Sequence, residues 1–181
     1  YMSNWLGGGS CYEPSIEGKK VPIELSLAVH SDAGFDSNGG LIGSLAICTT
    51  NFNEGKLNSG ISRLISKDFA NRLLNGFDRD LPAIANRWAR RYLWDRNYSE
   101  TRNPEVPSAI IETLSHQNFP DMILGQAPNF KFAMARSLYK TVTRFINEGH
   151  GRPTIIQPLA PHNFKVEFTD NSHIRLAWKA T

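Results

Sequence analysis

The chain has 181 residues and a mass of 20.3 kDa; 40% of its residues are hydrophobic and 20% are charged. This composition supports a packed core and excludes a wholly disordered or collagen-like chain. The formal net charge is +3, and basic and acidic residues are interspersed along the chain, so we expect no nucleic-acid partner. No apolar run approaches the roughly 18 residues that cross a bilayer, so we expect no membrane span.

Two strands are predicted in the first fifty residues. Residues 22–29 alternate between apolar and polar side chains and run into a polar turn after His30. Residues 41–49 are apolar almost throughout, which is typical of a buried strand. Cys48 lies in this second run and reads as a core residue, while Cys11 lies in a turn. The sequence leaves open whether the two form a single disulfide, but two cysteines make no disulfide framework.

Helical spacing replaces this alternation from residue 59. Apolar residues form one stripe from Ile61 to Phe77, which predicts a long amphipathic helix. Asp80 near an N-cap and Pro82 in the first turn predict a second helix from residue 80 to about Tyr92. Residues 108–114 predict a third strand, followed by a short helix and then by a strong helix that ends at Gly149. Strands mixed with long amphipathic helices indicate an α/β layer fold.

The last part of the chain has a different texture. Residues 164–168 and 174–178 each alternate, and an Asp-Asn pair between them predicts a turn, so we expect an antiparallel hairpin. A lone hairpin is marginally stable. We therefore divide the chain into an α/β domain, residues 1–151, and the opening strands of a β-sandwich, residues 154–181, whose apolar face we expect chain beyond Thr181 to cover.

Two residues are the main candidates for chemistry. His30 stands at the carboxyl end of a strand, where open α/β sheets bind ligands, and Asp32 is close enough in sequence to orient it as a metal ligand. A solvated histidine at a strand end is the alternative. Glu112 lies in an apolar strand, where burial would raise its pKa toward the range of a general base. The alternative is a solvated carboxylate or a pair with Arg102.

Weaker candidates surround these two. His116 and Asn118 belong to the polar loop that follows the third strand and would line a pocket there, although such a segment is more often simply a loop. Arg102 is the strongest candidate in its segment to donate hydrogen bonds to an anionic substrate.

Two segments resemble the zinc-dependent N-acetylmuramoyl-L-alanine amidases (the amidase_3 family). Residues 25–33, LSLAVHSDA, are similar to the strand that carries that family's last zinc-binding histidine. Residues 102–118, RNPEVPSAIIETLSHQN, are similar to the segment that carries its catalytic glutamate. The wording of residues 4–10 and 114–122 is closer to a divergent bacterial branch labelled xanthan lyase, in which a fibronectin type III-like domain follows. The final hairpin is similar to the first two strands of such a domain.

The resemblance implies a twisted, mostly parallel sheet flanked by helices. It also implies that His30 is a zinc ligand and that Glu112 is the catalytic base. The orienting role of Asp32 and the substrate-binding roles of Arg102, His116 and Asn118 are predictions from the residues themselves. The family's two earlier ligands, a histidine and a glutamate, have no counterpart before His30, so we expect the chain to begin after them. A catalytic zinc normally has three protein ligands.

The implied function is zinc-dependent hydrolysis of cell-wall amide bonds in a secreted, periplasmic or cell-envelope protein, with peptidoglycan or another polysaccharide as substrate. Two alternatives remain open. One is a non-catalytic module that binds glycan or peptidoglycan and has lost the metal. The other is a polysaccharide lyase of the xanthan-lyase type.

Overall fold

The computed structural model describes residues 2–9, 17–86 and 88–179, and Cys11 lies outside them. Its elements, in chain order, are α1 (Met2–Gly7), β1 (Ser26–Asp32), β2 (Ser44–Cys48), the 3-10 turn η1 (Asn53–Gly55), α2 (Leu64–Asp80), β3 (Arg90–Asp95), α3 (Ser99–Arg102), β4 (Ser108–Ser115), α4 (Phe119–Gln126), α5 (Pro128–Gly149), β5 (His162–Phe168) and β6 (Ile174–Lys179).

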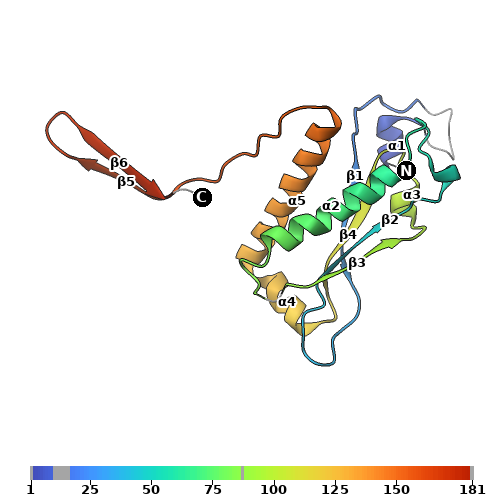
Figure 1. Cartoon of the computed structure of the whole chain (residues 1–181), viewed down its shortest axis with the longest axis horizontal. Coiled ribbons are helices and arrows are strands. Elements are labelled where there is room, and N and C mark those ends of the chain that lie inside the picture. The colour runs from blue at the N-terminus through green and yellow to red at the C-terminus, as the bar shows by residue number, and fades with distance from the viewer. Residues whose placement is uncertain (1, 10–16, 87, 180–181) are drawn as a thin grey trace.

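Four strands form one sheet in the order β1-β4-β2-β3 (Figure 1). β1 runs parallel to β4, and β2 runs parallel to β3, whereas β2 and β4 are antiparallel. The sheet is therefore mostly parallel and is accompanied by helices, which confirms the predicted fold class. The predicted strands at 22–29, 41–49 and 108–114 correspond to β1, β2 and β4, with β1 starting later and β2 shorter than expected.

The two faces of the sheet have different partners. Leu27, Ala46 and Ile111 point toward α2 and α5, where the main core lies around Phe69 and Phe77. A smaller buried cluster occupies the other face, with Leu45, Ile47 and Ile110 at its centre. Cys48 is fully buried in the main core, and burial raises the pKa of its thiol to about 12, so it is an inert core residue, as predicted.

Helices α2 and α5 approach closely on the main face of the sheet (Figure 1). At Gly76 of α2, an added Cβ would lie 2.5 Å from Oγ1 of Thr141 and 3.1 Å from Oγ of Ser137, both on α5. The missing side chain therefore sets how near the two helices come. The predicted helices ending at Phe77 and Gly149 are confirmed as α2 and α5.

The predicted helix from Asp80 to about Tyr92 is wrong. After α2, residues 81–86 form turns, and residues 90–95 form strand β3, which pairs with β2 along the edge of the sheet. The cause is tertiary: Gly43, with φ +75°, lies so close to the segment before β3 that a Cβ would fall 1.8 Å from the carbonyl oxygen of Ala89. Pairing with a buried strand outweighs the helix preference of the alanines in this segment.

Strands β5 and β6 form the predicted antiparallel hairpin, in which Val166 pairs with Leu176 and Phe168 with Ile174. All residues of both strands are exposed, and the hairpin stands apart from the sheet and its helices in Figure 1. Among the residues that the structure describes, no helix has the length and apolarity that a bilayer crossing requires.

Candidate active site at the ends of β1 and β4

The two main candidates meet across neighbouring parallel strands. His30 of β1 is in register with Glu112 of β4, and His30 Nδ1 lies 3.8 Å from Glu112 Oε1. Each follows by two positions a residue of the smaller cluster, Ala28 and Ile110, so both side chains belong to the face turned away from α2. Side chains near the carboxyl ends of parallel strands converge in this way because the strands share one direction. The structure thus brings together the two residues that the strand pattern singled out.

Glu112 is the more enclosed of the two. Its side chain is 12% exposed, and Oε2 is buried with no hydrogen-bond partner. Burial raises the pKa of this carboxyl, and nearby Asp32 adds to the rise, while His30 and Arg91 oppose it. A carboxylate with a raised pKa and an oxygen without a hydrogen-bond partner is suited to take a proton from water, because its pKa is shifted toward neutral pH.

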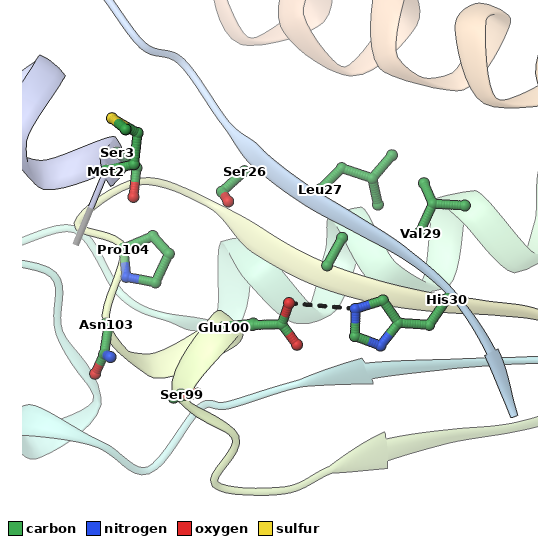
Figure 2. Close-up of a pocket in the computed structure, with 11 residues that line it drawn as sticks. Met2, Ser3, Ser26, Leu27, Val29, His30, Ser99, Glu100, Asn103 and Pro104 are labelled. Atoms are coloured by element: carbon green, nitrogen blue, oxygen red, sulfur yellow. Dashed lines mark hydrogen bonds and ion pairs between the residues drawn. The ribbon is translucent and has the colours of Figure 1, made fainter.

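A second carboxylate reaches His30 from the opposite side. Oε1 of Glu100, on α3, lies 3.2 Å from Nε2 of His30, and Figure 2 shows the two side chains pointing toward one another. Both line a pocket of about 580 Å³, whose wall also includes Ser26–Val29 and Ser99. Glu100 is not predicted from the sequence, because a charged residue on a four-residue helix carries no periodic signal that would place it near β1.

The short helix α3 is held by buried groups. Arg63, which precedes α2 and is fully buried, donates from Nη2 to the carbonyl of Arg102 at 3.0 Å and from Nε to that of Lys56 at 3.1 Å. Thr101 of α3 shares a 2.7 Å hydrogen bond with Thr49, beside the end of β2. These contacts fix the backbone that carries Glu100 against the sheet.

Asp32 has other partners than His30. Its carboxylate accepts a hydrogen bond from Arg91 of β3, at the far edge of the sheet, and one of 2.8 Å from the backbone N–H of Ala33. The carboxylate that contacts the imidazole of His30 from outside β4 is thus that of Glu100. Asp32 instead links the end of β1 to the start of β3. Its carboxylate has no hydrogen bond to His30 among the described residues that would support the predicted orienting role.

The weaker candidates lie around this site without lining the pocket. Nδ1 of His116 is 3.2 Å from Oγ of Ser31, near the end of β1. Arg102 donates to Oδ1 of Asn97 at 3.0 Å. Asn118 is buried; its Nδ2 donates to Asp121 and to the carbonyl of residue 40, and its Oδ1 accepts from the backbone of residue 36. The described lining of the pocket includes none of the three, and their roles in substrate binding stay predictions.

The donors at this site suit a divalent metal ion in kind. An imidazole and carboxylates are ordinary zinc ligands, and the orphaned Oε2 of Glu112 gives a nearby cation or a metal-bound water an acceptor. In number they are fewer than a catalytic zinc needs: within the described ranges, no three histidine, cysteine, aspartate or glutamate side chains are arranged to hold a metal. His30 is the one imidazole that faces Glu112 there.

No family model and no curated protein sequence matches this chain. Its fold is similar to solved N-acetylmuramoyl-L-alanine amidases. AmiC2 of Nostoc punctiforme matches with a TM-score of 0.54 at 12% identity, over 71% of this chain and 61% of that one. The amidase of Clostridium difficile 630 matches with a TM-score of 0.52 at 13% identity, over 68% and 58%.

The catalytic domain of CwlV from Bacillus (Paenibacillus) polymyxa var. colistinus gives a TM-score of 0.51 at 15% identity, over 71% of this chain and 61% of that one. The chain therefore spans about six-tenths of the length of the amidases that it matches. At these identities the likeness establishes the fold, and the fold is that of the amidases.

Proposed function

We propose that this chain carries part of the catalytic domain of a hydrolase that cleaves amide bonds in cell-wall peptidoglycan. The observation that carries the proposal is the convergence of His30 and Glu112, whose Nδ1 and Oε1 atoms lie 3.8 Å apart on one face of the sheet. The likeness to structures of N-acetylmuramoyl-L-alanine amidases supports the substrate class, and with it a secreted, periplasmic or cell-envelope location.

In this proposal His30 would be one ligand of a zinc ion. Bound zinc would polarise the scissile carbonyl and lower the pKa of a water molecule. Glu112 would accept a proton from water at its carboxylate and pass it to the leaving amine, and its raised pKa fits this role. The pocket that His30 and Glu100 line leaves room for a substrate group beside His30.

The proposal extends to the rest of the chain in one respect. The exposed apolar face of the β5–β6 hairpin fits the opening strands of a fibronectin type III-like sandwich, as in the branch labelled xanthan lyase. In that arrangement the hairpin belongs to a neighbouring module and takes no part in the chemistry.

Substitution of Glu112 by glutamine tests the proposed function. Glutamine keeps the shape of the side chain and removes its basicity, so we expect E112Q to lower hydrolysis by about 10²- to 10⁴-fold. Zinc binding should be unchanged, because a general base acts on the water and need not hold the metal. The measurement is mass spectrometry of stem peptides released from purified sacculi by the zinc-supplemented protein, together with the zinc content of each variant.

The matched control is E17Q, which makes the same change on a side chain that is 82% exposed. Loss of zinc together with activity in E112Q would make Glu112 a ligand and contradict its assignment as the base. Sacculi that are bound and never cleaved, even by the protein with its natural metal, would instead favour a non-catalytic binding module.

A further inference from the structure

Strand register places a third charged side chain in line with the candidate pair. His30 of β1 is in register with Glu112 of β4, and Glu112 is in register with Leu45 of β2. The register between β2 and β3 shifts at this point, so that two residues of β3, Arg91 and Tyr92, stand opposite Leu45. One row of residues therefore crosses the sheet from His30 to Arg91.

The guanidinium of Arg91 lies over the same face of the sheet as Glu112. Its Nη2 donates to the hydroxyl of Tyr92 at 3.3 Å, and the ring of Tyr92 lies against that of Trp94, which packs on the smaller cluster of this face. The charge of Arg91 also opposes the rise in the pKa of Glu112 that burial causes. The cation and the candidate base are thus neighbours above one surface.

The ion pair of Arg91 crosses this surface. Its Nη1 donates to Asp32, the last residue of β1. β1 and β3 are the outer strands of the four-stranded sheet, with β4 and β2 between them. At the usual spacing of strands the pair therefore spans about 14 Å, over the two strands that carry Glu112 and Leu45.

We propose that Arg91 binds a carboxylate of the substrate, and that the carboxylate of Asp32 takes that place on the guanidinium while no substrate is bound. The inference rests on the proposed function, to which it adds a specificity-determining residue and the substrate group that this residue recognises. The position of Arg91 on β3 is two strand spacings, or about 10 Å, from Glu112, and its side chain reaches back over that interval toward Asp32.

The dimensions of a peptide fit this arrangement. An extended chain advances about 3.3–3.6 Å per residue. A substrate whose scissile amide bond lies at Glu112 would bring a carboxylate to the guanidinium of Arg91 if that carboxylate is one or two residues further along. The subsite therefore selects a peptide with an acidic group close to the bond that is cleaved.

Arg91 has the exposure and the donors that a second carboxylate requires. Its side chain is 20% exposed and that of Asp32 is 28% exposed, so a ligand can reach the pair. Its bonds to Asp32 and Tyr92 use fewer N–H groups than a guanidinium carries, and guanidinium groups bind carboxylates through two donors at once. The sequence predicts Arg102 for an anionic substrate, and the register adds Arg91 on the face of the candidate base.

The alternative is an ion pair that only holds the two outer strands together. The two explanations differ in what removal of Asp32 does. In a purely structural pair, D32N and R91Q both loosen this face, so both weaken ligand binding. If Asp32 takes the place of a substrate carboxylate, D32N frees the guanidinium and strengthens binding, whereas R91Q weakens it.

The test is an NMR titration of the full chain in metal-free buffer. The probes are an N-acetylmuramoyl dipeptide that ends in glutamate and the same compound with its carboxylates converted to amides. For the acidic probe we expect R91Q to lower affinity about 10- to 100-fold, the usual effect of removing charge-assisted hydrogen bonds, and R91K to fall between R91Q and the wild type. D32N should raise affinity by up to about fivefold, the effect of a partly exposed ion pair. Affinity for the amidated probe should be lower in the wild type and should change in none of the variants.

R96Q is the matched control. Arg96 directly follows β3 and lies 5.5 Å from the ring centroid of Trp94, much as Arg91 lies 5.4 Å from that of Tyr92. R96Q should bind both probes as the wild type does. Weaker binding in D32N as well as in R91Q, equal effects on the two probes, or a wild type that binds neither would overturn the subsite. An acidic probe that binds through Arg91 while sacculi are never cleaved would support the subsite and contradict the proposed hydrolase.

Discussion

Arg63, which is buried, and Glu112, which is largely enclosed, differ in how their charges are partnered. The guanidinium of Arg63 reaches backbone carbonyls and the carboxylate of Glu105, at 3.6 Å, so its charge is compensated. Glu112 has one oxygen near His30 and another with no hydrogen-bond partner. A fully partnered charge stabilises structure, whereas a carboxylate kept short of partners stays reactive. The contrast marks Arg63 as structural and supports the proposal that Glu112 is the base.

A residue-level prediction concerns Asp80, which links the end of α2 to Lys140 of α5 at 2.7 Å. Burial acts to raise the pKa of this carboxyl, but hydrogen bonds from Arg79 and Lys140 outweigh burial and lower it. The folded state therefore binds the proton less tightly than the unfolded chain. The stabilisation that ionised Asp80 contributes is complete above the ordinary pKa of 3.8. It is lost as the pH falls through the lower pKa that this carboxyl has in the folded state.

We accordingly expect D80N to lower the free energy of unfolding by about 1 kcal/mol near neutral pH, and by less as the pH falls below 3.8. Urea titrations of wild type and D80N across that range measure the difference. E17Q, with its exposed carboxylate, should match the wild type throughout. If D80N lowers the free energy of unfolding by the same amount in acid, the loss comes from packing and not from charge.

The sequence could predict the residues of the site that strands position. His30 and Glu112 follow alternating or apolar runs, and parallel strands bring such residues to a common end. Glu100 could not be found in the same way, since its place depends on how the loop before β4 folds back over the sheet. The sequence places Asn118 in a loop that would line a pocket, yet its amide satisfies buried backbone groups through contacts that only the folded chain supplies.

At the level of elements, the alternation of apolar and polar residues predicts strands β5 and β6, although all residues of both strands are exposed in the structure. The sequence pattern does not predict strand β3, because Pro82 and the following alanines resemble the start of a helix. In β3, Tyr92 and Trp94 lie two positions apart on one face of the strand, and their ring centroids are 4.9 Å apart. Pairing partners that are distant in sequence decide such a segment.

The α2–α5 contact gives an element-level prediction. G76A adds a methyl group 2.5 Å from Oγ1 of Thr141, so the helices must separate or Thr141 must move. Overpacking of this kind costs about 1–3 kcal/mol, against about 1 kcal/mol gained from helix propensity. We expect net destabilisation in urea unfolding. At Gly149 an added Cβ meets nothing within 4 Å, so G149A should be neutral or stabilising. Equal effects of the two changes would show that α2 and α5 are not in tight contact.

At the scale of the whole molecule, the hairpin presents an apolar face to solvent. Phe168 is 84% exposed and Trp178 60%, and Val166 and Leu176 lie on the same face. An uncovered face of this kind favours contact with another apolar surface. We expect the isolated chain to self-associate with increasing concentration, as sedimentation velocity would measure.

The substitution L176E should reduce this association, because it places a charge in the middle of the apolar face. A177E introduces the same charge one residue along, on the opposite face of the strand, and should leave association unchanged. Neither variant should alter the unfolding of the α/β body. Wild-type chain that stays monomeric at high concentration, or equal effects of the two variants, would remove the hairpin face as the cause.

The contacts of Arg63 couple the stability of α3, which carries Glu100, to the stability of the core. Arg63 immediately precedes α2, whose apolar side forms the centre of the main core, and the same side chain holds the carbonyl of Arg102 in α3. A four-residue helix would ordinarily fray on its own, opening and closing many times while the rest of the protein stays folded. Here α3 cannot open without also exposing a buried guanidinium. Amide hydrogens of α3 should therefore exchange with solvent about as slowly as those of α2, and warming should not loosen the wall of the pocket before the body melts.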